Sequence, residues 1–543
     1  MGDIINYCFL ILAICLSYRN LPNMYFQQDE WFYFGQALYA KYSNFSNIFS
    51  LWGDIHFTPL YFLFLNIEYS LFGLQYQYYA YLSITLHIAV SLLLYILLLK
   101  ITKYRTAAFC GSVFFALSSS HSQALTWFAA MPECIPQAIC ILSAILCWIY
   151  WLQKKSLRLL LLSLMFYVFA LLIKEDAVVL IITLPILSTY FFRKNISYTT
   201  LVPYAVITII YGISRFLFML QSSGNFFHYF LTNASHIPRW VGFSFVSKTA
   251  LLELFRTLTG VYQSFISSTI DETVFARICA VAICIIWCVW NVLLYRKLHG
   301  VSLIWRLVFL FLPIAWFLPF FVLGHDLMDL ESRYYYLPVL FFAIIIADQC
   351  SNLRYHSKYF TYMFIGALTL LILVNSYVIN SSIRRDSVIS EYRIKTVSSI
   401  RQFLKTDNKT VIYLTLGDHL AFQSGFGQML LVLTANRILH LFLSYQTISC
   451  GTWPVRDTGK LKGMVSGTIG ISKRSWKIKR SMDSLLKTLL PSHSTGILRS
   501  FPTLLKVFNG KYINRLNIHI YSVSRSPEYL RKYFRLFVLY CYS

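Results

Sequence analysis

Long runs of apolar residues recur along the chain and restrict its fold more than any other feature. Four of the longest cover residues 80–99, 139–152, 159–173 and 359–379. A helix that crosses a bilayer needs roughly 20 mostly apolar residues. Only 13% of the 543 residues are charged, whereas soluble domains carry about 25%. The chain is therefore predicted to be an integral, multi-pass membrane protein of the all-α class.

The apolar runs predict about eleven spanning helices. The first is expected to be a membrane helix because it lacks the positive n-region and small-residue cleavage site of a signal peptide. Residues 57–72 are apolar, but the segment is short and carries Glu68, so we expect an interfacial helix that does not cross. The eleven spans are placed near residues 4–20, 79–99, 107–126, 133–152, 157–173, 176–192, 199–220, 273–295, 302–323, 334–350 and 359–379.

Charge in the short loops supports this topology. If residues 57–72 do not cross, basic residues collect in alternate loops and most acidic ones in the opposite loops, which is the positive-inside pattern. Asp3 before the first helix and Arg19 after it favour the reverse orientation locally, but thirteen basic residues outweigh them. The basic loops are therefore predicted to be cytoplasmic, and they contain Lys100, Lys103, Arg105, Lys154, Lys155, Arg158, Arg193, Lys194, Arg296, Lys297, Arg306, Arg354 and Lys358.

Two regions are predicted. Residues 1–380 form the membrane module, with outer loops at 20–78 and 221–272, and residues 381–543 form a small α/β or α+β extramembrane domain. The chain beyond Val378 carries a net charge of +18 out of a total of +25. This excess is typical of contact with anionic headgroups or phosphates, or of a solvated basic surface. No nucleic-acid-binding motif accompanies the charge, and no cysteine or histidine cluster has zinc spacing, so neither a nucleic-acid partner nor a metal site is predicted from these patterns.

The acidic pair Asp29 and Glu30, just after the first predicted helix, is the first candidate site. A carboxylate within hydrogen-bond reach of a hydroxyl can act as its base, and Asp29 is the candidate, with Glu30 orienting it or supporting a cation. The alternative is an acidic N-cap on an interfacial helix that runs from Glu30 to Lys41.

Further candidates lie in other outer connections. Each has a simpler alternative: solvation for the histidines, helix capping for the hairpin charges, and an interfacial aromatic belt for the tyrosines at 334–336. All are predicted on one face, where cationic side chains could bind a phosphate. The candidates for substrate binding are His56, His121, Lys174, Glu175, Glu331 and Arg333.

The order of these parts resembles the C-type (GT-C) polytopic glycosyltransferases, in particular protein O-mannosyltransferase-like enzymes and the tetratricopeptide-bearing transmembrane mannosyltransferases. The resemblance covers roughly residues 1–380, and no tetratricopeptide pattern follows. It depends on the acidic pair, a His-x-x-Pro entry at 56–59, Leu86-His87, the stretch 115–121 with Trp127, the pair Lys174-Glu175, and Arg333 followed by Tyr-Tyr-Tyr-Leu-Pro at 334–338.

The resemblance implies inverting transfer of a mannose-like hexose from a polyprenyl-phosphate carrier to a hydroxyl on the non-cytoplasmic face. Asp29 would be the base with Glu30 beside it, and Lys174 and Arg333 would hold the carrier phosphate. The acceptor and the need for a divalent metal ion stay open. A bacterial inner membrane is favoured over the endoplasmic reticulum. The alternatives are a lipid-linked polysaccharide polymerase or ligase, a transporter or flippase of lipid-linked sugars, and a non-catalytic scaffold.

Overall fold

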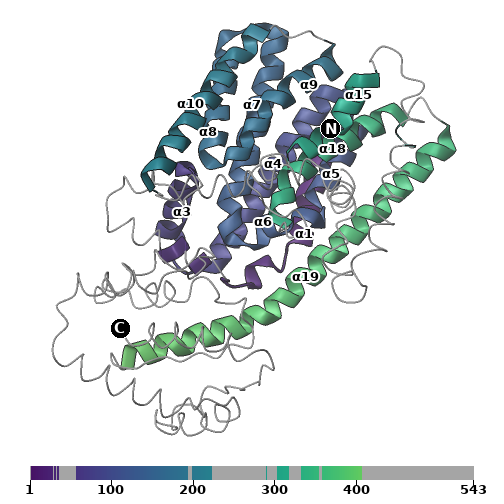
Figure 1. The fold of residues 1–543 in the computed structure, drawn as a ribbon. Helices are drawn as coiled ribbons and strands as arrows, with labels where there is room; N and C mark the ends of the chain where they lie inside the picture. The colour runs from purple at the N-terminus through teal and green to yellow at the C-terminus, as the bar shows by residue number, and fades with distance from the viewer. Residues whose placement is uncertain are drawn as a thin grey trace, which may run out of the picture. The chain divides into compact units, whose positions relative to one another are not determined.

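The computed structural model of the protein describes residues 2–27, 30–31, 33–35, 57–193, 198–222, 289, 291, 303–316, 332–353 and 357–406. Within these ranges the chain forms α-helices, short 3-10 helices (η) and turns, without a β-strand (Figure 1). Seven helical stretches of the described chain are long and apolar enough to cross a membrane. The all-α, multi-pass membrane class is therefore confirmed. The number of eleven spans stays a prediction, because residues 273–295 lie almost entirely outside the described ranges.

The described elements follow one another along the chain, with undescribed stretches between some of them. In order they are α1 (Gly2–Ser17), η1 (Leu21–Asn23), α3 (Pro59–Phe72), α4 (Tyr76–Thr102), α5 (Arg105–Ala116), η3 (Ser119–His121), α6 (Gln123–Thr126), η4 (Phe128–Ala130), α7 (Met131–Lys154), α8 (Leu157–Ile173), η5 (Glu175–Val179), α9 (Leu180–Phe192), α10 (Tyr198–Ser222), α15 (Leu303–Leu310), α16 (Leu312–Ala315), η8 (Ser332–Tyr335), α18 (Tyr336–Asn352) and α19 (Lys358–Thr406).

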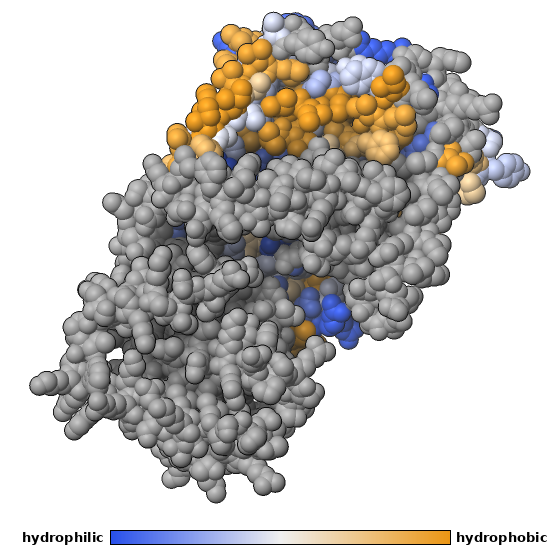
Figure 2. Space-filling model, viewed as in Figure 1, coloured by the Kyte–Doolittle hydropathy of each residue, from blue (hydrophilic) through white to orange (hydrophobic). Residues whose placement is uncertain are grey.

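The outer surface of the helices is apolar, as expected for a lipid-facing surface. On α8 and α10 large apolar side chains such as Leu161, Ile209 and Leu217 are more than half exposed. Figure 2 shows this surface as an orange band across the helical part of the molecule. Soluble monomers rarely expose a continuous apolar patch of more than a few hundred Å². The band is therefore consistent with hydrocarbon as the surrounding solvent.

Several basic loops meet at one end of the helices. Arg105 Nε, at the start of α5, lies 3.0 Å from the carboxylate of Asp3 in the first turn of α1. Lys100, in the last turn of α4, lies over the ring of Tyr150 near the end of α7, with Nζ 4.6 Å from the ring centroid. These contacts bring the start of α1, the end of α4, the start of α5 and the end of α7 together. We call this the basic end.

The predicted span at 107–126 is broken in the structure. Helix α5 has 12 residues, or about 18 Å at 1.5 Å per residue, and is too short to cross a bilayer core of about 30 Å. The chain then turns through η3 and α6. The main-chain N–H and the side-chain hydroxyl of Ser119 both donate to Asn375 of α19, at 2.8 and 2.7 Å. The helix ends at Ala116, and Ser119, three residues later, forms its hydrogen bonds with another helix.

Two other segments bear on the predicted topology. Helix α3 has 14 residues, about 21 Å in length, and its interfacial position stays a prediction. Helix α19 runs for 49 residues to Thr406, well past the predicted end of the last span at 379. It also crosses the predicted boundary between residues 380 and 381, which stays untested.

Helices α5 and α18 approach closely at Gly111. A methyl group at this position would lie 2.7 Å from the main-chain oxygen of Ala343 and 3.0 Å from the Cβ of Ala347, both in α18. A real Cβ does not come so close to a carbonyl oxygen, so the two helices can pack at this distance only around a glycine. The contact holds α18, and with it η8, against α5.

We predict that Gly111→Ala lowers the stability of the protein by about 1–3 kcal/mol, because the added methyl group overpacks a rigid contact. The measurement is the melting temperature in detergent. Gly212→Ala and Gly366→Ala are matched controls, since a methyl group there meets nothing within 4 Å and alanine favours a helix. An unchanged melting temperature for Gly111→Ala would contradict the close packing of α5 on α18.

Candidate active site

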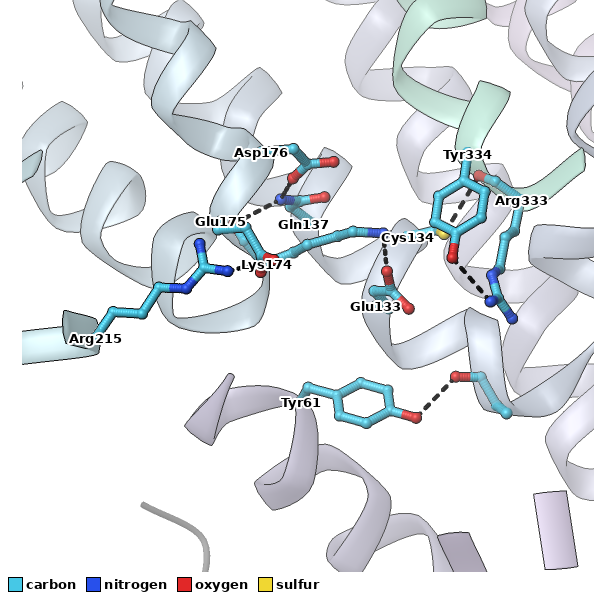
Figure 3. Close-up of polar contacts among 11 residues, drawn as sticks. Tyr61, Glu133, Cys134, Gln137, Lys174, Glu175, Asp176, Arg215, Arg333 and Tyr334 are labelled. Carbon is cyan, nitrogen blue, oxygen red and sulfur yellow. Dashed lines mark hydrogen bonds and ion pairs between the residues drawn. The ribbon is translucent and has the colours of Figure 1, made fainter. Parts of the chain in front are cut away.

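The first turns of α7 and the residues just before them collect contacts from most of the predicted outer connections. We call residues 127–137 the hub. It lies at the end of α7 opposite the basic end, because α7 runs from Met131 to Lys154. Glu133 and Gln137 are four residues apart on this helix, so their side chains share one face. Both reach the connection between α8 and η5 (Figure 3).

Lys174 occupies that connection, and the hub holds it in two ways. Its ammonium forms an ion pair with the carboxylate of Glu133, and its side chain is 7% exposed against 22% for Glu133. Its main-chain oxygen accepts a hydrogen bond of 3.0 Å from Gln137 Nε2. The same amide group also donates to the carboxylate of Asp176. A lysine that is almost entirely buried between two apolar helices thus has a fixed position and a carboxylate counterion.

Arg333 lies on the other side of the hub, in η8. Its guanidinium carbon is 4.1 Å from the ring centroid of Trp127 and 4.8 Å from that of Tyr334. Its Nη2 donates to the hydroxyl of Tyr334 at 2.9 Å. Gln123 fixes η8, since its main-chain N–H donates to Ser332 Oγ at 3.1 Å and its Oε1 accepts from the main-chain N–H of Arg333 at 3.4 Å. The planar guanidinium is therefore held by stacking on a buried tryptophan.

Lys174 and Arg333 converge on one aromatic ring. The Lys174 ammonium lies 4.7 Å from the centroid of Tyr334, and the Arg333 guanidinium lies 4.8 Å from the same centroid. Two predicted phosphate ligands from separate connections are thus brought together. The two cations place positive charge next to the ring that they share, and the carboxylate of Glu133 neutralises part of this charge. Tyr334, expected in the sequence analysis to be part of an interfacial belt, has a specific position between them.

Glu30 is the described member of the acidic pair, and it is fully buried. Its two carboxylate oxygens accept main-chain hydrogen bonds of 2.5 Å from Gln27 and from Phe128 of η4. Burial raises the pKa of Glu30 to about 8, although these hydrogen bonds and the charge of Arg393 act to lower it. Both oxygens accept hydrogen bonds from main-chain N–H groups. Glu30 is therefore suited to fix the segment after α1 against the hub rather than to accept a proton from a substrate.

Helix α19 holds the same segment from the other side. Arg393 Nη1 donates to the side-chain oxygen of Gln27 at 3.0 Å. The main-chain N–H of Tyr25 donates to Ser390 Oγ at 3.0 Å. Tyr25, Gln27 and Glu30 are thus held by the hub and by a helix more than 350 positions later in the sequence.

Helices α3 and α10 complete the surroundings. The Tyr61 hydroxyl of α3 donates to the main-chain oxygen of Ala129 in the hub at 3.0 Å. Burial raises the pKa of Tyr61, while the charge of Arg333 acts in the opposite direction. On α10, Arg215 Nη2 lies 3.5 Å from Glu175. Glu175 therefore pairs with α10, and Figure 3 shows Lys174 extending in a different direction, toward Glu133.

His121 lies in the protein interior, with no exposed side-chain surface. Its Nε2 donates to the main-chain oxygen of Phe115 at 2.9 Å, so the neutral ring carries its proton there. Its ring centroid is 5.6 Å from that of His87 and 4.9 Å from that of Tyr336. Burial lowers the pKa of His121 to about 4. The ring packs against Phe115, His87 and Tyr336 as a neutral core residue, and the substrate contacts proposed below do not include it.

Three predicted site residues, Asp29, His56 and Glu331, lie outside the described residues. Within the described ranges, no group of three histidine, cysteine or acidic side chains could hold a metal ion.

Several contributors to the site were not expected from the sequence. Gln137 could have been found, because it follows Glu133 by four positions on a predicted helix. Trp127 was noted only as part of a motif, and its stacking with Arg333 is a long-range contact. Ser390 and Arg393 follow the last predicted span, and local sequence gives no signal that they reach residues 25–27.

We predict that Glu30→Ala lowers the stability by roughly 2–4 kcal/mol, because it leaves two buried N–H donors without an acceptor. The melting temperature in detergent measures this loss. Glu391→Ala on the exposed face of α19 is the matched control and should melt like the unchanged protein. Equal melting temperatures for Glu30→Ala and the control would show that the two hydrogen bonds do not hold the segment.

We predict that His121→Gln reduces the loss of stability on acidification. The folded pKa of about 4 lies below the value of about 6.5 for an unperturbed histidine, so the folded state binds fewer protons than the unfolded state. The contribution is complete above pH 6.5 and is lost as the pH falls toward 4, on the order of 1–3 kcal/mol. Glutamine keeps a donor for Phe115 but does not titrate. Melting temperatures between pH 4 and 7 should therefore fall less steeply for the variant, and parallel curves would contradict the assignment.

No family model matches the chain, and no curated protein matches its sequence. Among solved structures, it is similar to the crystal structure of the Archaeoglobus fulgidus oligosaccharyltransferase in complex with Zn and sulfate. The sequence identity is 11% and the TM-score is 0.43, and the match covers 78% of this chain and 61% of the archaeal chain. The chain thus spans less than two thirds of that protein. A likeness at this level is too weak to carry a conclusion about fold or function.

Proposed function

We propose that the protein is a membrane glycosyltransferase that transfers a hexose from a polyprenyl-phosphate carrier to an acceptor hydroxyl at the non-cytoplasmic face. The observation that carries the proposal is the convergence of Lys174 and Arg333 on the ring of Tyr334. Both cations belong to the end of the helices away from the basic loops. A phosphate at a membrane surface is the anion that such a pair of cations would bind.

The proposed reaction is a direct displacement at the anomeric carbon. The acceptor oxygen forms a bond to this carbon while the bond from the carbon to the phosphate oxygen breaks, which inverts the configuration. The acceptor proton passes to Asp29, the proposed base, and the carrier leaves as polyprenyl phosphate. Lys174 and Arg333 stabilise the negative charge that develops on the leaving phosphate. Glu30 is a positioning residue, because its carboxylate fixes the segment next to Asp29 against the hub.

A transferase is supported over a flippase by the placement of the charges. Transport of a lipid-linked sugar requires polar groups deep in the membrane. In the described part of the chain, Glu30, Glu133, Lys174 and Arg333 lie around the beginning of α7, at the helix ends. This end position is where a lipid-borne phosphate group lies.

The proposal predicts that Asp29→Asn lowers transfer by at least about 100-fold, as expected for loss of a general base. Membranes that contain the protein are incubated with a radiolabelled polyprenyl-phosphate mannose, and the label that leaves the lipid fraction is counted. Lys174→Met and Arg333→Met should each lower kcat/KM for the donor about ten- to hundredfold, as expected for loss of a hydrogen bond to a charged group. Arg158→Met, an exposed change at the basic end, is the matched control.

The outcomes separate the parts of the proposal. Equal transfer with and without Asp29 removes that residue from the mechanism. Label that crosses the bilayer but stays on the lipid indicates a flippase. No transfer from any polyprenyl-phosphate hexose by the unchanged protein overturns the proposal as a whole.

A further inference from the structure

The ammonium of Lys174 already has an anionic partner within the protein, the carboxylate of Glu133. Glu133 is not one of the residues expected to bind substrate. It lies in the first turn of α7, where the helix dipole favours a negative charge. Its side chain is 22% exposed, three times as much as that of Lys174. An anion that approaches Lys174 would therefore meet this carboxylate first.

The other two acidic groups of this region have partners elsewhere. Glu175 pairs with Arg215 of α10, and Asp176 accepts a hydrogen bond from Gln137. Glu133 forms the ion pair with the Lys174 ammonium, although the charge of Lys174 also acts on Asp176.

The position of Lys174 does not depend on Glu133. The main-chain N–H of Lys174 donates to Ala170 at 3.0 Å, and its main-chain oxygen accepts from Gln137 at 3.0 Å. The backbone is therefore fixed at both its donor and its acceptor. Only the ammonium group would have to exchange one anion for another, and the ring of Tyr334 lies beside it at 4.7 Å.

We propose that Glu133 is a competing counterion, which the carrier phosphate displaces from Lys174 as the reaction proceeds. This inference rests on the proposed function. The sugar-linked phosphate is a diester with one negative charge, and the phosphate monoester that leaves carries up to two. A lysine already neutralised by Glu133 gains little by binding the donor and more by binding the departing phosphate. Lys174 would thus discriminate between the two states, which is the condition for an interaction to raise kcat.

A substitution of Glu133 should therefore change the affinity for phosphate in the direction opposite to that expected for most residues at a substrate site. Removing the charge in Glu133→Gln should tighten binding of the carrier phosphate rather than weaken it. It should also lower both KM and kcat, because donor and product are then held more alike and the product leaves more slowly. A purely structural ion pair predicts the reverse for binding, since its loss would loosen the α7 and α8 connection that presents Lys174.

The experiment measures equilibrium binding of radiolabelled farnesyl phosphate to the full chain in nanodiscs of neutral lipid, with farnesol as the uncharged probe. Glu133→Gln should lower Kd for farnesyl phosphate about three- to tenfold, the effect of removing one competing charge at a partly exposed site, and should leave farnesol binding unchanged. Glu391→Gln removes an equal charge from the exposed face of α19 and should leave both constants unchanged. The melting temperature of each variant is measured in parallel.

Two further variants keep the test decisive. Glu133→Asp keeps the charge but withdraws it from the ammonium by one methylene, so it should give a smaller decrease in Kd and preserve folding. In the Lys174→Met background, Glu133→Gln should give no further tightening, because the two residues then no longer act on each other. Equal or weaker binding of farnesyl phosphate by both Glu133 variants overturns the inference. If the unchanged protein binds farnesyl phosphate no better than farnesol, the phosphate site of the proposed function fails instead.

Discussion

The buried contact between the start of α7 and its surroundings determines how the remaining parts of the site are placed. Residues 127–137 contact the segment after α1 through Phe128, α3 through Ala129, the α8–η5 connection through Glu133 and Gln137, and η8 through Trp127 and Cys134. Four connections that are far apart in sequence thus share one short stretch of helix. The polar groups of each connection find partners there, as buried main-chain groups must.

The charged groups of the site must be stabilised where they are buried, and they must also be able to bind an incoming anion. Burying an ion is costly unless it is paired, and Lys174 meets this requirement with Glu133 while Arg333 stacks on Trp127 and Tyr334. Aromatic faces lower the cost of burying a cation without neutralising it. The protein therefore keeps one cation with a counterion and one against aromatic rings, and the two differ in how readily each can accept an incoming anion.

The sequence predicted the class of fold and most of the helices, because a membrane restricts the length and the composition of a spanning segment. It also predicted that Lys174 and Arg333 lie on one face of the membrane, because the charges of the short loops follow the positive-inside rule. It predicted an unbroken helix at 107–126, because the apolar run does not reveal that Ser119 bonds to Asn375. It assigned a catalytic role to Glu30 and substrate binding to His121, and it did not predict that both side chains form hydrogen bonds with the main chain. Contacts such as these depend on pairs of residues distant in sequence, which a pattern of local spacing does not encode.

The length of α19 has a mechanical meaning. Asn375 on this helix holds η3, and Ser390 and Arg393 hold Tyr25 and Gln27. Fifteen residues separate the first two of these positions, about 22 Å along a helix axis. Because a helix transmits rotation and tilt along its axis as a stiff rod does, a small swing of α19 about one anchor displaces the other. Helix α19 is therefore a common support for η3 and for residues 25–27, and a movement of either one would act on the other through this helix.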